Sequence, residues 1–238
     1  MPPATIEIPT EYLRDTERPR CAFLAGYARS GAALIRTIMA SCFGRQTTSI
    51  YLENYIGTDY IRLLKHVELA ESEAILPELA AAGGLVIKTH DIPPPAWPRV
   101  PAIVIVRDGR RVFRSLLAFY RECNGIDQTM LGLIRGEHTW GDWSDWIRTW
   151  AFLCSRRALW LRYEDVMADR RTAVNRLAAY FGIDPISYEI PAFATFQAAK
   201  PNIFRVAATS GNGGMTEAEE AEFWQRHGGT MAMLGYYR

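Results

Sequence analysis

Hydrophobic residues follow two different spacings near the start of the chain. Cys21–Ala25 is an apolar run that ends at Gly26, which is typical of a short buried strand. From Gly31 to Phe43, apolar residues recur at helical spacing, at Leu34, Ile35, Ile38, Met39 and Cys42. The pattern therefore predicts a strand, a glycine-bounded loop and a helix in close succession.

The same succession recurs further along the chain. Leu85–Thr89 and Ala102–Val106 are apolar runs, and the β-branched residues of the second indicate a parallel strand buried on both faces. Ala158–Tyr163 predicts a fourth strand, and helices are predicted for Arg110–Arg121 and Val166–Gly182. This alternation predicts an α/β fold with a doubly wound, mostly parallel central sheet, which binds ligands at the carboxyl ends of its strands.

The composition is that of an ordinary globular protein. The chain has 238 residues, of which 49% are hydrophobic and 22% charged, so we expect one domain over residues 1–238. A net charge of +1 provides no global field to recruit nucleic acid or an anionic membrane. Any anion site must therefore be local.

Targeting signals are not evident in the sequence. No apolar run approaches the roughly 20 residues of a membrane span, and the first residues lack the basic and apolar regions of a signal peptide. The cysteines have no metal-binding spacing, which favours buried thiols in a reducing compartment; they are Cys21, Cys42, Cys123 and Cys154. We therefore expect a cytoplasmic protein without a metal site.

The first loop, from Gly26 to Gly31, has two glycines at the spacing of a phosphate-binding loop. Between a strand and a helix, it would direct backbone N–H groups at an anion. A nucleoside-triphosphate site needs Lys and then Ser or Thr after Gly31, but Ala32 and Ala33 stand there. Arg29 supplies a cation from within the loop instead. The alternative is a plain turn with a surface arginine.

Polar residues also follow the other predicted strands. Lys88 and His90 combine a point charge with a titratable base at a strand end. Arg107 ends the third strand, with Ser115 about two helical turns into the next helix, and Tyr163 ends the fourth. The alternatives are a structural histidine, an ion pair of Arg107 with Asp108 or Glu122, and core packing of the tyrosine.

Together and in this order, these segments resemble the sulfotransferases that use 3′-phosphoadenosine 5′-phosphosulfate (PAPS). Residues 23–31 resemble the family's 5′-phosphosulfate loop, residues 88–90 its Lys-Thr-His motif and residues 105–115 its 3′-phosphate motif. Residues 161–166 are similar to its Tyr-Glu-Asp-Leu segment. Phe204-Arg205 and Met233–Tyr236 resemble its C-terminal region.

The resemblance implies transfer of a sulfuryl group from PAPS, with release of adenosine 3′,5′-bisphosphate (PAP) and no metal. Arg29 and Lys88 would stabilise charge on the bridging oxygen, and His90 would take the proton of the acceptor. The implied cofactor-binding residues are Arg29, Ser30, Gly31, Ala32, Ala33, Leu34, Arg107, Ser115, Tyr163, Phe196 and Arg205. The expected partner is a small-molecule acceptor, with no nucleic acid or membrane, and a homodimer is left open.

Three positions depart from the family pattern. Residues 32–34 replace the usual Thr-Thr-Trp, which removes two hydroxyl donors and an aromatic ring that often stacks on adenine. Arg205-Val206-Ala207 stands in place of Arg-Lys-Gly, so one cation for the 3′-phosphate is missing. Trp146 takes the place of a histidine in a Gly-x-Trp-x-x-His segment.

Other interpretations stay open at this point. Glu53 could imitate the glutamate base of relatives with carbohydrate acceptors, or be a solvated glutamate on a helix. The departures also fit a catalytically inactive PAP-binding protein, and an ATP-dependent P-loop kinase is a further alternative. Trp143, Trp146 and Trp150, near Trp140, predict a helix that either packs on the core or forms a wall of the acceptor pocket. His138 could touch the acceptor; His66 and His227 suggest no role.

Overall fold

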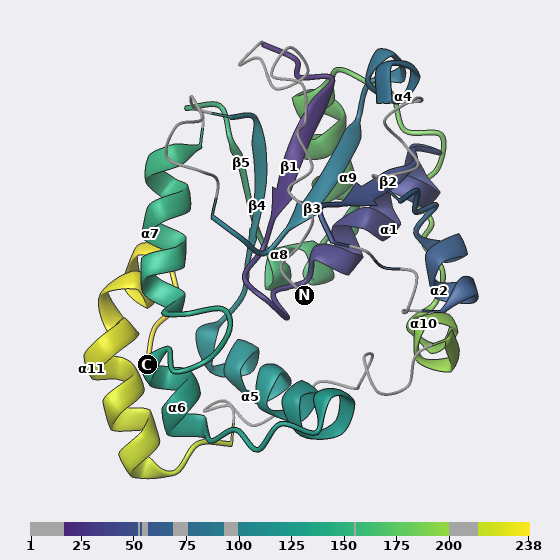
Figure 1. Ribbon diagram of the computed structural model, residues 1–238. Helices are drawn as coiled ribbons and strands as arrows, with labels where there is room; N and C mark the ends of the chain where they lie inside the picture. Colours follow the sequence, from purple (N-terminus) through teal and green to yellow (C-terminus); the bar gives the residue numbers. More distant parts are fainter. Residues whose placement is uncertain are drawn as a thin grey trace.

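Five parallel strands form the centre of the molecule. The computed structural model describes residues 17–51, 53, 57–68, 76–92, 100–154, 156–199 and 214–238. The sheet has the strand order β2-β3-β1-β4-β5, and all described pairings are parallel (Figure 1). The strands are β1 (Cys21–Ala25), β2 (Thr47–Ser49), β3 (Leu85–Thr89), β4 (Ala102–Val106) and β5 (Leu159–Arg162).

Helices flank this sheet along its length. They are α1 (Ala32–Cys42), α2 (Thr58–Leu63), α4 (Leu76–Ala82), α5 (Gly109–Phe119), α6 (Met130–Arg135), α7 (Trp143–Leu153), α8 (Tyr163–Ala168), α9 (Arg170–Phe181), α10 (Phe193–Ala199) and α11 (Glu217–Met233). A π-helical turn, Tyr120–Asn124, extends α5. Among the described residues, no helix is both long and apolar enough to cross a membrane.

The core lies on both faces of the sheet. Successive strand residues point to opposite faces, so Ala22 and Leu24 pack with α1 and α9, whereas Phe23 and Ala25 pack with α5, α7 and α11. All residues of β1 and β4 are buried, as strands covered on both sides require. The expected fold class, an α/β fold with a doubly wound parallel sheet, is confirmed.

The predicted strands match closely, but one strand was not predicted. β1, β3 and β4 have the predicted bounds, and β5 is one residue shorter at each end than Ala158–Tyr163. β2 was missed because its three residues, Thr-Thr-Ser, carry no apolar pattern. They are nevertheless fully buried, since the Thr47 hydroxyl donates to the Leu64 carbonyl and the Thr48 hydroxyl to the Val67 carbonyl.

The single helix predicted for Val166–Gly182 is wrong. Two helices, α8 and α9, occupy the segment, and Tyr163 begins α8 rather than ending a strand. The break falls at Asp169, which leaves helical geometry at φ −139° and ψ 87° and caps α9 by accepting the Thr172 N–H at 3.0 Å. Gly182 ends α9 in a left-handed conformation, as the sequence predicted.

The cap at Asp169 gives a test of this helix break. Asp169→Ala removes the acceptor of both the Thr172 N–H and the Thr172 hydroxyl, so we expect a loss of about 1 kcal/mol in the free energy of unfolding. Urea unfolding followed by tryptophan fluorescence measures the loss. Asp184→Ala, which removes an exposed acid outside a helix, is the matched control and should change stability by less than about 0.5 kcal/mol. Equal effects of the two substitutions would contradict the capping role.

Candidate functional site

The loop between β1 and α1 lies at the carboxyl edge of the sheet (Figure 1). Gly31 starts α1 at φ 110°, and no described side chain caps the helix, so the N–H groups of Ala32 and Ala33 are left for an anion. The Ser30 N–H donates to the Tyr27 carbonyl at 2.9 Å, which closes the turn. The buried Ser30 hydroxyl has no hydrogen-bond partner within the described part of the chain.

Tyr163 supports this loop from beneath. A Cβ atom added at Gly31 would lie 2.5 Å from Cδ2 of the Tyr163 ring, so only glycine fits at this contact. The Arg107 guanidinium lies over the same ring, with its carbon 4.5 Å from the ring centroid. Tyr163 therefore positions the loop and Arg107 together, which a simple core-packing role would not require.

Arg29, Arg107 and Ser115 are in direct contact. Arg29 Nε donates to the Ser115 hydroxyl at 3.1 Å, and Arg107 Nη1 donates to the Arg29 carbonyl at 3.2 Å. Arg29 has the unusual φ of 72°, a strained conformation for a residue with a side chain. Arg107 does not pair with Asp108, which binds Arg110 instead. The structure thus brings together Arg107 and Ser115, which the sequence assigned to the 3′-phosphate, and Arg29, which it assigned to the sulfuryl end.

Lys88 is held by a buried carboxylate. Its Nζ lies 2.6 Å from Glu53 Oε1, and the other oxygen of Glu53 accepts from Arg36 Nη1 of α1 at 2.5 Å. Burial raises the pKa of Glu53, but Lys88 and Arg36 more than offset this and bring the pKa down to about 2. The interpretation of Glu53 as a solvated glutamate on a helix is therefore wrong, because the side chain is only 1% exposed and lies outside a helix.

Sequence reasoning missed Arg36 entirely. It lies on α1 among buried apolar residues, and its side chain is 1% exposed. Besides Glu53 it reaches Thr47 of β2 and His66, which accepts its Nη2–H through Nδ1 at 2.8 Å. The one available signal was a charged residue inside the apolar pattern of the helix, since buried arginines are rare unless paired.

His90 follows β3 in an aromatic setting. Its ring stacks on Tyr51, with centroids 5.7 Å apart, and meets Trp140 edge-on at 5.0 Å. The Trp146 indole N–H donates to the His90 carbonyl at 2.6 Å and fixes its backbone. The structure therefore places the side chains of Tyr51 and Trp140 beside the candidate base.

The hydrogen bonds of His90 define its tautomer. Nδ1 lies 2.5 Å from the Gly26 carbonyl, which only accepts, so Nδ1 carries the hydrogen and Nε2 keeps a lone pair. Burial, followed by the charge of Lys88, lowers the pKa of His90 to about 3, so the ring is neutral at physiological pH. A neutral ring with an unprotonated Nε2 is the form that a general base requires.

His138 has a structural role. Tyr27 donates its hydroxyl hydrogen to the Gly141 carbonyl at 2.6 Å, so His138 Nε2–H must donate to the Tyr27 oxygen at 2.9 Å. His138 Nδ1 in turn accepts the Trp140 N–H at 3.3 Å. Nε2 thus joins the 138–141 segment to the loop, Nδ1 is bonded within that segment, and neither nitrogen is left for an acceptor.

The tryptophans differ in their burial. Trp143, Trp146 and Trp150 of α7 are buried in the core, so the core-packing interpretation holds for them. Trp140 is only partly buried and stands beside His90.

Among the remaining candidates, Phe196 is buried beside Tyr60 and Leu64, and Ala33 packs against the same cluster. Leu34 packs against the core on the α1 side of the sheet. Arg205 lies outside the described residues. Within the described chain, no three His, Cys, Asp or Glu residues are grouped to hold a metal ion.

Comparisons with known proteins agree with this geometry. A family model described as the sulfotransferase domain matches residues 19–227. A comparison with curated protein sequences gave no match. Among solved structures, the mouse sulfotransferase SULT7A1 complexed with PAP is 17% identical, with a TM-score of 0.64, 92% of this chain covered and 85% of that chain.

A second similar structure is retinol dehydratase in a complex with retinol and PAP. It is 18% identical, with a TM-score of 0.61, 90% of this chain covered and 82% of that chain. A structure of retinol dehydratase with androsterone and PAP has the same identity and TM-score. At such identities the likeness shows the fold. The match of the family model confirms the resemblance read from the motifs.

The buried neutral histidines predict that stability depends on pH. Burial lowers the pKa of His90 to about 3 and that of His138 to about 4, below the ordinary value of 6.5. As the pH falls, these histidines therefore bind protons in the unfolded chain before they do so in the folded protein. The free energy of unfolding should be largest above pH 6.5 and should decrease as the pH drops towards 4. Urea unfolding at a series of pH values measures this fall.

His138→Gln is the informative variant for this dependence. It removes one group that binds a proton more readily on unfolding, so stability should fall less steeply between pH 6.5 and 4 than in the wild type. A wild-type stability that stayed constant from pH 6.5 to 5 would show that these rings are not buried in the neutral form.

Proposed function

The chain belongs to the sulfotransferase family, and from this premise we propose that it transfers a sulfuryl group from PAPS to a hydroxyl or similar group of a small molecule, releasing PAP. The main observation behind the proposal is that three cations and a neutral imidazole lie around the start of α1, which no described side chain caps. Arg29, Lys88, Arg107 and His90 all stand at the carboxyl edge of the sheet.

The donor would be held by backbone and cationic groups. The N–H groups at the start of α1 would receive the 5′-phosphosulfate, as helix N-termini receive other oxyanions. Arg107 and Ser115, with Arg205, would hold the 3′-phosphate. The three similar structures whose descriptions name PAP support this choice of nucleotide.

Charge would be stabilised at the leaving group by the chain's own cations. As the acceptor oxygen bonds to sulfur and the bond to the bridging oxygen breaks, negative charge develops on PAP, and Arg29 and Lys88 would offset it. Lys88 enters this step already aligned by Glu53. The residues after Gly31 supply no hydroxyl ligand for Mg²⁺, so the proposal uses no metal ion.

His90 is the proposed base rather than Glu53. Its Nδ1–H is fixed to Gly26, so Nε2 would accept the proton that leaves the acceptor hydroxyl. The negative charges of bound PAPS would raise the pKa of this ring from its low value towards the working range. Glu53, with a pKa of about 2 and both oxygens in ion pairs, is a poor proton acceptor.

The acceptor is proposed to be a small molecule that lies near the rings of Tyr51 and Trp140. These rings flank His90, and retinol and androsterone are the small molecules named with retinol dehydratase. A catalytically inactive PAP-binding protein is the second candidate, which the departures at Ala32, Ala33 and Leu34 favour.

Ligand-induced stabilisation tests the choice of nucleotide. PAP at about 100 times its dissociation constant should stabilise the fold by about 2.7 kcal/mol, which corresponds to a rise in Tm of roughly 5–10 °C for a chain of this size. Mg-ATP should give little rise. Arg107→Ala should reduce the effect of PAP, whereas Arg148→Ala, at an exposed ion pair on α7, should not. Stabilisation by Mg-ATP and not by PAP would favour a kinase.

Turnover of a His90 variant tests the base. His90→Ala should lower turnover at least about 100-fold while PAP binding changes little, because the proton acceptor is lost and the phosphate contacts remain. Transfer of labelled sulfate from PAPS to a panel of acceptors measures turnover. Near-normal turnover of this variant would move the role to Glu53. PAP binding by the wild type without transfer to any acceptor would support the inactive candidate.

A further inference from the structure

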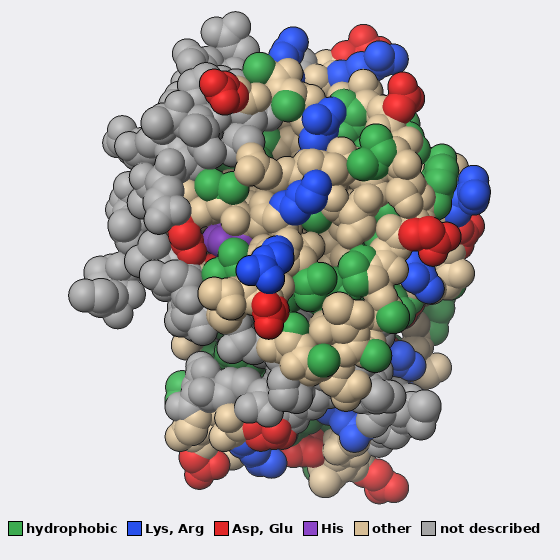
Figure 2. All heavy atoms as spheres, turned by 90° about the vertical axis from the view of Figure 1, so that its right-hand side faces the viewer, with side chains coloured by type: hydrophobic (Ala, Val, Ile, Leu, Met, Phe, Trp, Pro, Cys, Tyr) green, Lys and Arg blue, Asp and Glu red, His purple; other side chains and the backbone are tan. Residues whose placement is uncertain are grey.

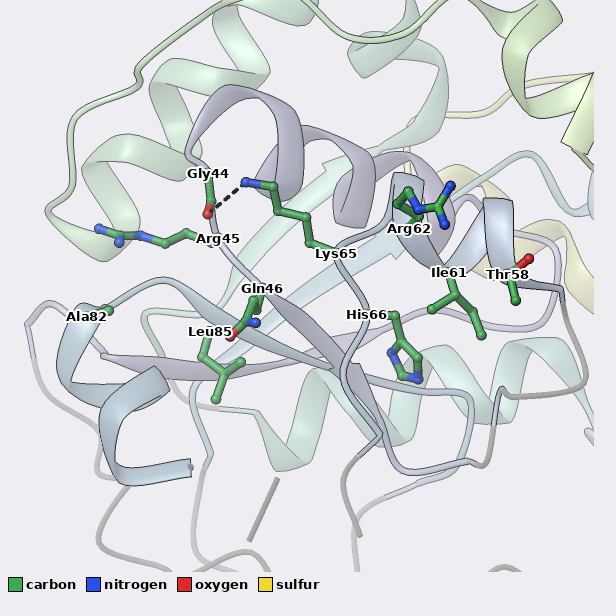
Figure 3. A pocket seen from close by; sticks show the side chains of 11 residues that line it. Gly44, Arg45, Gln46, Thr58, Ile61, Arg62, Lys65, His66, Ala82 and Leu85 are labelled. Carbon is green, nitrogen blue, oxygen red and sulfur yellow. Dashed lines mark hydrogen bonds between the residues drawn. The ribbon is translucent and has the colours of Figure 1, made fainter. Parts of the chain in front are cut away.

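The structure has a cavity at the edge of the sheet opposite to the candidate donor loop. It has a volume of about 800 Å³ and is lined by residues of the segments 44–46, 58–66 and 82–85 (Figure 3). The first and last of these segments precede or begin β2 and β3, so the cavity lies at the amino ends of these strands. The donor loop follows the carboxyl end of β1, at the opposite edge of the parallel sheet.

The charge of this cavity is entirely positive among its described lining residues. Arg45, Arg62 and Lys65 line it, and no Asp or Glu does. Figure 2 shows Lys and Arg side chains down the middle of the face that carries α2 and β2. These charges are weakly compensated: Lys65 Nζ donates to the neutral Gly44 carbonyl at 3.3 Å, and Arg62 meets the exposed Asp59 at 3.5 Å.

Arg45 has a hydrogen-bond donor without an acceptor among the described residues. Its Nε is buried and makes no hydrogen bond within the described part of the chain. A buried N–H without an acceptor costs free energy, which an oxyanion would recover because it can accept two hydrogen bonds from one guanidinium.

Lys65 has a strained backbone. Its φ of 45° makes it, with Arg29 of the donor loop, one of two described non-glycine residues at positive φ. The surroundings hold it there: its N–H donates to the Arg62 carbonyl at 3.1 Å, and its carbonyl accepts the Thr47 N–H at 3.1 Å. Such strain is concentrated at functional sites.

The arrangement of the three cations indicates the form of the ligand. In Figure 3, the side chains of Arg45 and Arg62 extend on opposite sides of Lys65. An extended molecule with a charged group at each end would meet cations on both sides of Lys65. The volume is that of a site for a small organic molecule.

We propose that this cavity binds a small polyanion with at least two phosphate or sulfate groups, at a site separate from the donor site. His66 forms part of the wall rather than a ligand, because its Nδ1 accepts from Arg36 and its Nε2 lies 3.2 Å from Glu68 Oε1.

Calorimetric titration with inorganic pyrophosphate tests the proposal. The protein is first saturated with PAP, so that the proposed donor site is occupied. We expect pyrophosphate to bind at one further site and inorganic sulfate at least tenfold more weakly, because sulfate carries one charged group. Equal affinity for sulfate, or full competition between pyrophosphate and PAP, would overturn the proposal.

A double variant locates the binding. Arg45→Gln with Lys65→Asn removes two charges, and asparagine tolerates the positive φ at position 65. This variant should bind pyrophosphate at least about tenfold more weakly with an unchanged Tm. The matched control is Arg135→Gln with Arg148→Gln, which removes two charges from exposed ion pairs elsewhere and should bind normally. Equal losses in both variants would contradict the site.

The test is independent of the proposed transfer reaction. An Arg107→Ala protein, in which the proposed donor site is weakened, should keep its affinity for pyrophosphate. Loss of pyrophosphate binding in Arg107→Ala would place the anion at the donor loop and overturn the inference, whatever the outcome of the PAP experiments.

Discussion

The pairing of Glu53 with Lys88 and Arg36 is the interaction on which the candidate site depends. Arg29, Lys88 and Arg107 are gathered at one edge of the sheet, and burial lowers the pKa of Lys88, which opposes its charged form. Glu53 offsets this cost of burying Lys88, because one of its oxygens binds Lys88 of β3 while the other binds Arg36 of α1. Removing one member of such a buried set leaves an uncompensated charge, which typically costs about 3–5 kcal/mol.

This pairing also connects the two elements that carry the candidate donor loop and the candidate base. Arg36 belongs to the helix that starts at the phosphate loop, and Lys88 precedes the candidate base by two residues. The carboxylate between them fixes α1 against β3, while Tyr163 fixes Gly31 and Arg107 on the other side of the loop. Loop, lysine and histidine are therefore positioned before any ligand arrives, which is the condition for electrostatic stabilisation of a transition state.

The sequence could predict the parts of this site that depend on local pattern. Continuous apolar runs located β1, β3 and β4, and the polar residues after each run marked the functional edge. The sequence could not predict β2, because Thr47–Ser49 is buried through side-chain hydrogen bonds rather than through apolar surface. Nor could it predict the break at Asp169, where a local cap outweighs a helical pattern that continues on both sides.

Contacts between segments that are distant in the sequence could not be predicted, because local patterns do not encode them. Periodicity indicated that Trp143, Trp146 and Trp150 share a helix face but not that this face packs on the core. His138 Nε2 bonds the hydroxyl of Tyr27, 111 residues away, and no spacing rule connects the two residues.

The proposed function requires that the loop around Arg29 and the side chain of Arg107 bind the two ends of one adenosine nucleotide. The decisive experiment is a crystal structure of the protein soaked in PAP. We expect density for the 5′-phosphate over the amides that follow Gly31 and for the 3′-phosphate at Arg107 and Ser115. Nucleotide density at any other place, with none at these residues, would contradict it.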